Sequence, residues 1–177
     1  MTEPIFFDTD CLSAFLWVDE QSILPRLFKG RIIIPQSVYD ELLNSRVSLL
    51  VNRINIMLGN GQVELKSIEI GSKEHEMFEE LTQHPEPGFK IIGDGEAAAI
   101  SFAVNKDGVL ASNNLKDIKK YIEKYSIKHI TTGDILKKAM DKFIISEEEG
   151  NDIWNDMMNR QRWLGADSFT EFLRKSE

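Results

Sequence analysis

Short apolar runs alternate with longer amphipathic segments along most of the chain. The runs that predict strands are residues 4–7, 31–35, 63–68, 108–112 and 128–131. In the second run, three successive isoleucines precede Pro35, and β-branched residues of this kind favour extended backbone. Strands that alternate with helices predict an α/β fold whose central sheet is short and parallel, with helices on both faces.

Helical spacing of apolar residues marks the segments between these runs. The expected helices are residues 11–17, 36–43, 47–58, 73–83, 94–105 and 114–125, with two more after Thr131 and Ser146. Ser72 is an expected N-cap, and Ser146 with Glu149 matches a capping box. In the second helix, Val38, Tyr39, Leu42 and Leu43 are expected on one face.

Periodic apolar positions continue to the end of the chain, where they include Ile153, Trp154 and Phe169. This end is therefore expected to form helices that pack on the same core, so that residues 1–177 make one domain. Trp17, Trp154 and Trp163 are expected to be core or interface residues rather than base-stacking platforms.

The charge balance narrows the classes of partner. The 177 residues include 21 Lys and Arg against 29 Asp and Glu, a net charge of −8, which excludes nucleic-acid binding through overall basicity. Lysines between residues 116 and 128 still allow a local positive surface. A single cysteine, Cys11, excludes an intrachain disulfide, and the absence of a long apolar segment predicts a cytoplasmic protein that does not cross a membrane.

Polar residues follow two of the predicted strands. Asp8 comes directly after the first strand, and Ser112, Asn113 and Asn114 finish a later one, so they are expected at the carboxyl edge of the sheet, where ligands bind. Further carboxylates fall just after strands or in the first turns of helices, namely Asp10, Glu41, Asp94, Glu96 and Asp117.

These carboxylates have an ordinary structural interpretation and a functional one. Asp94 alone is typical of a helix cap, and Glu96 of an acid that favours a helix N-terminus. Gathered in one cleft, however, carboxylates repel one another unless they are protonated, paired with a cation, or bridged by a hard metal ion such as Mg²⁺ or Mn²⁺. The three histidines have no ligand spacing, so carboxylates are the remaining candidates for chemistry.

Four segments in order, FFDTDCLSAFL, IIIPQSVYDELL, IIGDGEAAAISFA and GVLASNN, together resemble the PIN-domain family of metal-dependent nucleases. The resemblance covers a core of about residues 4–135 and implies a three-layer α/β/α fold, with about residues 136–177 as a helical extension. It implies Mg²⁺ or Mn²⁺ as cofactor, RNA as substrate and hydrolysis of a phosphodiester by a metal-bound water. For many small bacterial members it also implies a toxin held inactive by an antitoxin protein, often as a homodimer.

The family's acids fall on specific residues of this chain. The first acid matches Asp8, the second Glu41 and the third Glu96, with Asp94 as an additional carboxylate. Helical periodicity alone does not choose between Asp40 and Glu41. Thr9 and Asp10 match the polar positions after the first acid, and Ser112 matches the small hydroxyl residue after the later strand.

The fourth acid of the family is missing, since its place is taken by Asn113 or Asn114. Asparagine offers a metal ion a carbonyl oxygen but no negative charge. Asp117, one helical turn beyond Asn114, is expected to reach the same cleft.

Two alternative functions follow from these residues. The two asparagines motivate a PIN-like domain that has lost catalysis and acts as a binding or regulatory module. A haloacid-dehalogenase-like phosphatase would use Asp8 as nucleophile and Asp10 as acid or base, but Leu12 and Ala98 depart from the pattern of that class.

Overall fold

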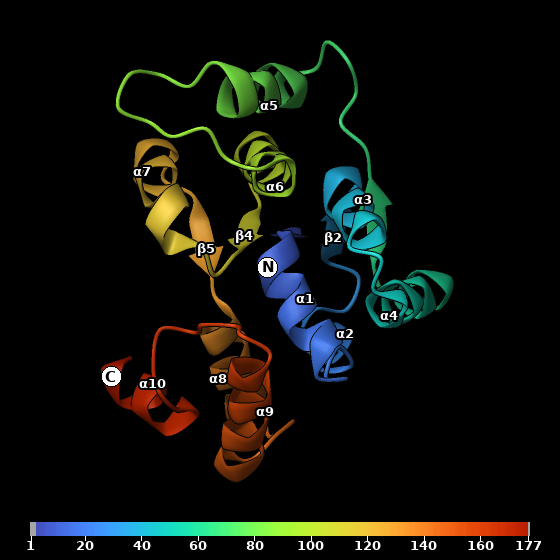
Figure 1. Ribbon diagram of the computed structural model, residues 1–177, viewed down its shortest axis with the longest axis vertical. Helices are drawn as coiled ribbons and strands as arrows, with labels where there is room; N and C mark the ends of the chain where they lie inside the picture. Colours follow the sequence, from blue (N-terminus) through green and yellow to red (C-terminus); the bar gives the residue numbers. More distant parts are fainter. Residues whose placement is uncertain (1–2, 177) are drawn as a thin grey trace.

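The computed structural model of the protein describes residues 3–176 and has a parallel five-stranded sheet at its centre (Figure 1). Its strands are β1 (Ile5–Phe7), β2 (Ile32–Pro35), β3 (Glu64–Lys66), β4 (Val109–Ala111) and β5 (Lys128–Ile130). Their spatial order is β3-β2-β1-β4-β5, and every neighbouring pair is parallel. All five predicted strands are present, and the predicted α/β/α fold class is confirmed.

Ten helices surround the sheet in the described residues. They are α1 (Thr9–Trp17), α2 (Ile23–Phe28), α3 (Gln36–Asn44), α4 (Ser48–Gly59), α5 (Lys73–Gln83), α6 (Asp94–Asn105), α7 (Leu115–Tyr125), α8 (Thr132–Asp141), α9 (Glu147–Asn159) and α10 (Phe169–Lys175). The predicted cap of α5 is confirmed, because the Ser72 hydroxyl accepts from the backbone N–H of His75. Thr131 and Ser146 begin α8 and α9 with complete capping boxes.

Alternate strand residues enter two separate cores, one on each face of the sheet. In β1, Ile5 and Phe7 pack in the core that includes α1, α2, α8 and α9, whereas Phe6 packs with α6 and α7. Figure 1 shows α5, α6 and α7 together on one side and α1, α2, α8 and α9 on the other. This alternation follows from the period of two of a strand and produces the three layers.

The C-terminal helices share the first of these cores. Trp154 and Phe169 are fully buried in the same cluster as the strand residues Ile5 and Phe7. The indole N–H of Trp154 donates a 3.1 Å hydrogen bond to the carbonyl of Ala166, so its polar group is also satisfied.

Between residues 36 and 59 the structure has the two expected helices, α3 and α4, and the turn that separates them contains Arg46, whose φ is +57°. Leu43, which was expected on the apolar face of α3, is 43% exposed. Helix α2 was not predicted; its Pro25 occupies the first turn, where the missing N–H costs no hydrogen bond. Of the helices between residues 3 and 176, none combines the length and the apolarity needed to cross a bilayer.

Candidate active site

Asp8 lies at the carboxyl edge of the sheet, as predicted. Its backbone N–H donates to the carbonyl of Ala111 at 3.0 Å, and the N–H of Ser112 donates to the carbonyl of Ile130 at 3.0 Å, so the ends of β1, β4 and β5 lie side by side. Asp8 Oδ1 caps α1 by accepting from the N–H of Cys11 at 2.8 Å. Its other oxygen, Oδ2, is buried and has no hydrogen-bond partner among residues 3–176.

Burial dominates the electrostatics of Asp8. Loss of solvent raises the pKa of its carboxyl to about 7, and the charges of Asp10 and Glu96 add to this effect. The hydroxyl of Ser112 and the N–H of Cys11 act in the opposite direction. The charged form of Asp8 is therefore costly unless a proton, a hydrogen-bond donor or a cation compensates it.

Glu41 reaches this edge from α3 and is held by two donors. The Thr9 hydroxyl donates to Glu41 Oε2, and the backbone N–H of Gly95 donates to Glu41 Oε1 at 2.8 Å. Asp40 instead lies on the exposed side of α3, where Gln36 donates to it at 2.8 Å. Helical periodicity could not distinguish Asp40 from Glu41. In the structure, Glu41 points toward the site and Asp40 points away from it.

Glu96 and Asp117 are joined by the side chain of Asn114. The amide Nδ2 of Asn114 donates to Glu96 Oε1 at 2.6 Å and to Asp117 Oδ2 at 3.1 Å. Partial burial raises the pKa of Glu96, against the hydrogen bond from Asn114. Asp117 also pairs with Lys90 at 2.8 Å, and this contact holds its pKa below the ordinary value.

A small cavity of about 230 Å³ lies beside Glu41 and Glu96. It is lined by Thr9, Asp10, Glu41, Gly93, Glu96 and Arg162, whereas the buried Asp8 does not line it. Arg162 follows α9 and forms a 2.9 Å ion pair with Asp10, 152 positions away. The cavity therefore places one guanidinium opposite several carboxylates.

Other predicted site residues lie elsewhere or have other partners. Asp94 is exposed in the first turn of α6 and does not line the cavity; the N-cap of this helix is Gly93, so Asp94 does not cap it either. Asn113 uses its amide to hold the start of α8, donating to the Thr132 hydroxyl and accepting from its N–H, both at 2.8 Å. Ser112 is buried, and its hydroxyl accepts from the N–H of Asn114 at 3.3 Å.

Sequence reasoning missed two residues of the site. At Gly95, a side chain would bring a Cβ within 2.7 Å of both Glu41 Oε2 and Thr9 Oγ1, so only glycine admits this contact. A glycine between two acids at the start of a helix was a usable signal, because glycine is a poor helix former. Arg162 gave no signal, because nothing in its local sequence relates it to Asp10.

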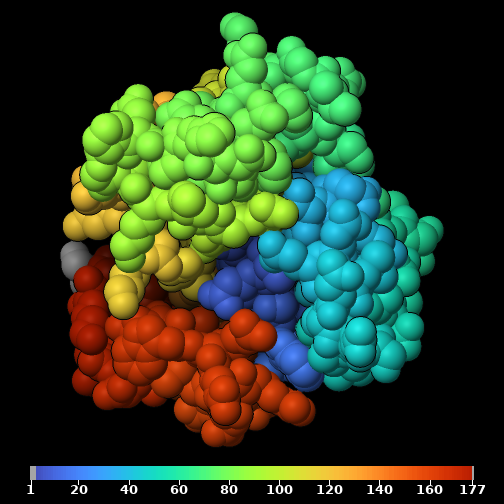
Figure 2. Space-filling view, turned by 45° about the horizontal axis from the view of Figure 1, so that its top comes forward, coloured from blue at the N-terminus to red at the C-terminus, as the bar shows by residue number. Residues whose placement is uncertain are grey.

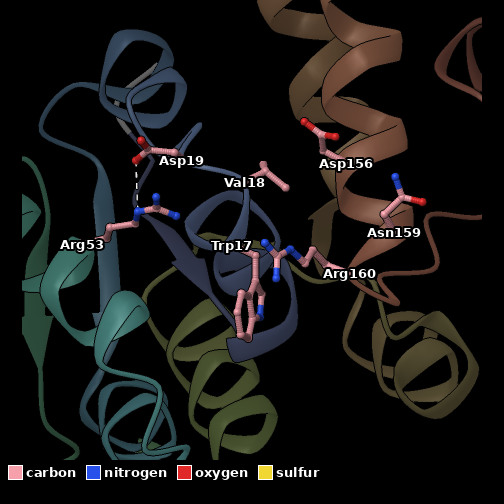
Figure 3. A pocket seen from close by; sticks show the side chains of 7 residues that line it. All are labelled: Trp17, Val18, Asp19, Arg53, Asp156, Asn159 and Arg160. Carbon is pink, nitrogen blue, oxygen red and sulfur yellow. Dashed lines mark ion pairs between the residues drawn. The ribbon is translucent and has the colours of Figure 1, made fainter.

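A second cavity, of about 530 Å³, lies away from the carboxylates (Figure 3). Here Asp19 pairs with Arg53 at 3.0 Å, and the Arg160 guanidinium lies over the ring of Trp17 at 5.4 Å. None of the predicted site residues lines it.

The oxygen donors of the carboxylate cluster suit a metal ion without forming a complete site. Between residues 3 and 176, no three His, Cys, Asp or Glu side chains converge as a ready-made metal site. The unpartnered Oδ2 of Asp8 and the nearby charge of Glu96 nevertheless fit a hard divalent cation. Asp8 and Glu96 are the residues that would hold such a cation.

Comparisons with known proteins identify the family of the chain. No curated protein matches the chain. Among solved structures, it is similar to a PilT N-terminus domain protein, SSO1118, from the hyperthermophilic archaeon Sulfolobus solfataricus P2, with 12% identity and a TM-score of 0.48 over 77% of this chain and 92% of that chain. A family model described as a PIN domain matches residues 4–177. The chain therefore belongs to the PIN-domain family.

Proposed function

We propose that this PIN domain is a Mg²⁺- or Mn²⁺-dependent ribonuclease that hydrolyses an RNA phosphodiester. PIN domains are generally nucleases and typically use divalent metals. The observation that carries the proposal is the fully buried Asp8, whose Oδ2 is unpartnered at the edge of the sheet beside the charge of Glu96. A buried carboxylate of this kind is costly unless it takes up a proton or a cation binds it, and a divalent cation would satisfy Asp8 and Glu96 together.

The buried Asp8 and the residues that line the cavity would have separate roles. Asp8 and Glu96 would hold the metal ion, which when bound lowers the pKa of water and neutralises charge on the phosphate. Glu41, fixed by Thr9 and Gly95, lines the cavity and would accept the proton that the attacking water loses. Arg162 would attract the phosphate, while its pair with Asp10 holds it in place.

The reaction is a hydrolysis. The oxygen of water forms a bond to phosphorus, the bond from phosphorus to the leaving ribose oxygen breaks, and that oxygen takes up a proton. No atom changes its oxidation state, so the reaction requires no oxidant or reductant. The toxin role, an antitoxin partner and a homodimer rest on the family resemblance. A cytoplasmic location rests on the single cysteine and the absence of a long apolar segment, and it is part of the same proposal.

One observation favours a second candidate, a PIN-like module that binds RNA or a partner without cleaving. Asn114 already donates to Glu96 and Asp117 and so satisfies two carboxylates that a metal ion would otherwise bridge. This candidate predicts very weak metal binding and no turnover.

Calorimetric titration of Mn²⁺ into metal-free protein tests the proposal. Wild type is expected to bind, Asp8→Asn is expected to lose binding, and Asp40→Asn, which removes the same charge from the exposed face of α3, is expected to bind as wild type does. RNA cleavage should be present in wild type and Asp40→Asn and absent in Asp8→Asn. It should stop when a chelator is added. Cleavage that survives the chelator or Asp8→Asn would overturn the ribonuclease proposal.

A further inference from the structure

A third cavity, of about 320 Å³, lies between α2 and α8 and shares no lining residue with the carboxylate cavity. The two helices are far apart in sequence but lie on the same side of the sheet in Figure 1, and in Figure 2 the blue N-terminal segment borders the orange-red C-terminal segments. Most of the lining is apolar and belongs to the sheet and to the inner faces of these helices: Ile5, Phe28, Val109, Ile130 and Ile135. The cavity therefore offers an apolar surface to a ligand.

Two bases stand beside this apolar lining. Arg31 and Lys138 line the cavity, and neither forms an ion pair within residues 3–176. The guanidinium of Arg31 lies 5.8 Å from the centre of the Phe28 ring, and the ammonium of Lys138 lies 5.7 Å from it. Arg31 Nε donates a 2.8 Å hydrogen bond to the carbonyl of Glu3, which fixes the guanidinium in place. Both cations are thus held near one aromatic side chain.

Two carboxylates also line the cavity, and each has a partner outside it. Glu3 forms an ion pair with Lys128. Asp134 belongs to the capping box of α8, where its Oδ2 accepts from the N–H of Thr131 at 2.8 Å and from the hydroxyl at 2.7 Å. Neither carboxylate forms an ion pair with Arg31 or Lys138, so both bases remain available to an anion.

The neighbouring surface adds further positive charge. A cavity of about 450 Å³ shares Lys138 and is also lined by Arg26 and Lys142, while no carboxylate lines it. Arg26 and Lys142 likewise form no ion pair in the part of the chain that the structure describes. Asp141, the other acid of α8, lines neither cavity. In a chain with a net charge of −8, these bases are a local concentration of positive charge that favours an anionic ligand.

We propose that the cavity between α2 and α8 binds a small carboxylate with an apolar tail. The carboxylate group lies between Arg31 and Lys138, and the tail lies against the isoleucines. A guanidinium presents a planar pair of donors that matches a carboxylate, and burial of the tail removes apolar surface from water. The site is independent of the proposed ribonuclease activity, because none of its residues lines the carboxylate cavity.

Calorimetric titration of octanoate into metal-free protein tests the site, and two related probes separate its two parts. Octanoate is expected to bind in a ratio of one to one. Hexanoate keeps the charge and is expected to bind about tenfold more weakly or worse, because each buried methylene contributes roughly a fourfold gain in affinity. Octanol keeps the tail and is also expected to bind about tenfold more weakly, because it loses the charged contacts.

Substitutions of the two bases test the position of the carboxylate group. Lys138→Gln and Arg31→Gln are each expected to weaken octanoate binding about tenfold. The matched control is Lys137→Gln, which removes the same charge from the neighbouring residue of α8 but lies outside both cavities, and it is expected to bind as wild type does. Thermal unfolding shows whether each variant is folded. If Arg31→Gln does not fold, Lys138→Gln and the three probes still decide the question.

Three outcomes would overturn the proposal. The first is no binding of octanoate to wild type, including the case in which the protein binds vesicles of anionic lipid but no free carboxylate. The second is equal affinity for octanol and octanoate, which would mean an apolar contact without a site for the anion. The third is octanoate binding by Lys138→Gln that is as tight as that by Lys137→Gln.

Discussion

The backbone N–H of Gly95 donates a 2.8 Å hydrogen bond to Glu41 Oε1, which joins the first turn of α6 to the middle of α3 across 54 positions of sequence. The contact has no room for a side chain, because a Cβ at Gly95 would lie within 2.7 Å of Glu41 Oε2. The position of a candidate catalytic carboxylate thus depends on a residue that carries no functional group.

Gly95→Ala is expected to keep the fold and lose activity. Alanine favours the helix by about 1 kcal/mol, but its methyl group displaces Glu41, and a misplacement of this size lowers turnover by roughly a hundredfold. Thermal unfolding and RNA cleavage measure the two effects. Gly59→Ala, at the end of α4 and outside the cavity, is the control, since a Cβ there meets open space; equal activity of both variants would show that the contact is unimportant.

Asp8 is expected to make the metal-free protein less stable as pH rises. Its pKa is about 7 in the folded chain against 3.8 for the ordinary carboxyl, so the folded state binds the proton more tightly. Stability is unaffected below pH 4, falls between pH 4 and 7 and then levels off, by roughly 4 kcal/mol in all at ~1.4 kcal/mol per pKa unit.

Denaturant unfolding of wild type and Asp8→Asn across this pH range isolates the effect of Asp8 from that of other groups. The difference in unfolding free energy should grow in favour of Asp8→Asn up to pH 7. A difference independent of pH would contradict the raised pKa. Mn²⁺ affinity of wild type should rise over the same interval, because the cation competes with the proton.

Asn114→Asp is expected to strengthen metal binding and to weaken the metal-free fold. The amide of Asn114 donates to Glu96 and Asp117, and a carboxylate in its place would repel both until a cation bridges them. Thermal unfolding with and without Mn²⁺ should show a lower midpoint without metal and a larger rise on its addition. Asn114→Ala, which removes the donor without adding charge, should show no such gain in affinity.

Arg162→Gln is expected to raise KM for RNA about tenfold or more, because it removes the guanidinium that lines the carboxylate cavity. Mn²⁺ binding should be little changed. Arg160→Gln serves as the control, since Arg160 lies two residues earlier but stacks over Trp17 in the separate cavity of Figure 3. Steady-state kinetics that fail to separate the two variants would rule out a phosphate-binding role for Arg162.

We also propose that the C-terminal helices and the sheet unfold together as one domain. Trp154 is fully buried in the core that contains the strands, so Trp154→Ala is expected to cost about 3–5 kcal/mol. Trp163→Ala, at a side chain that is 64% exposed, should cost little. Circular dichroism and fluorescence should report a single coincident transition in denaturant, whereas two separate transitions would indicate two domains.

The features that could be predicted from the sequence are those that depend on local patterns of residues. Period-two and helical spacing located the strands and most helices, and the rule that parallel strands share a carboxyl edge brought Asp8 to the same edge as Ser112. Caps at Ser72, Thr131 and Ser146 were readable because their partners lie three residues away.

What the sequence could not predict depends on long-range packing. Asp40 and Glu41 have equivalent local surroundings, and only the approach of α6 selects Glu41. Asp94 is a carboxylate two positions from Glu96 and so was a reasonable site candidate, yet the direction of the first turn of α6 leaves it exposed. The break at Arg46 requires a positive φ at a residue that is not glycine, for which no local signal exists.

The ion pair between Asp10 and Arg162 spans 152 positions, and this separation has a consequence during synthesis. A nascent chain emerges from its N-terminus, so Asp8, Glu41 and Glu96 leave the ribosome well before Arg162 and Trp163. The guanidinium of the cavity is therefore made after all three acids. A growing chain cannot close the Asp10–Arg162 pair, and so cannot complete the wall of the cavity, until residue 162 has emerged.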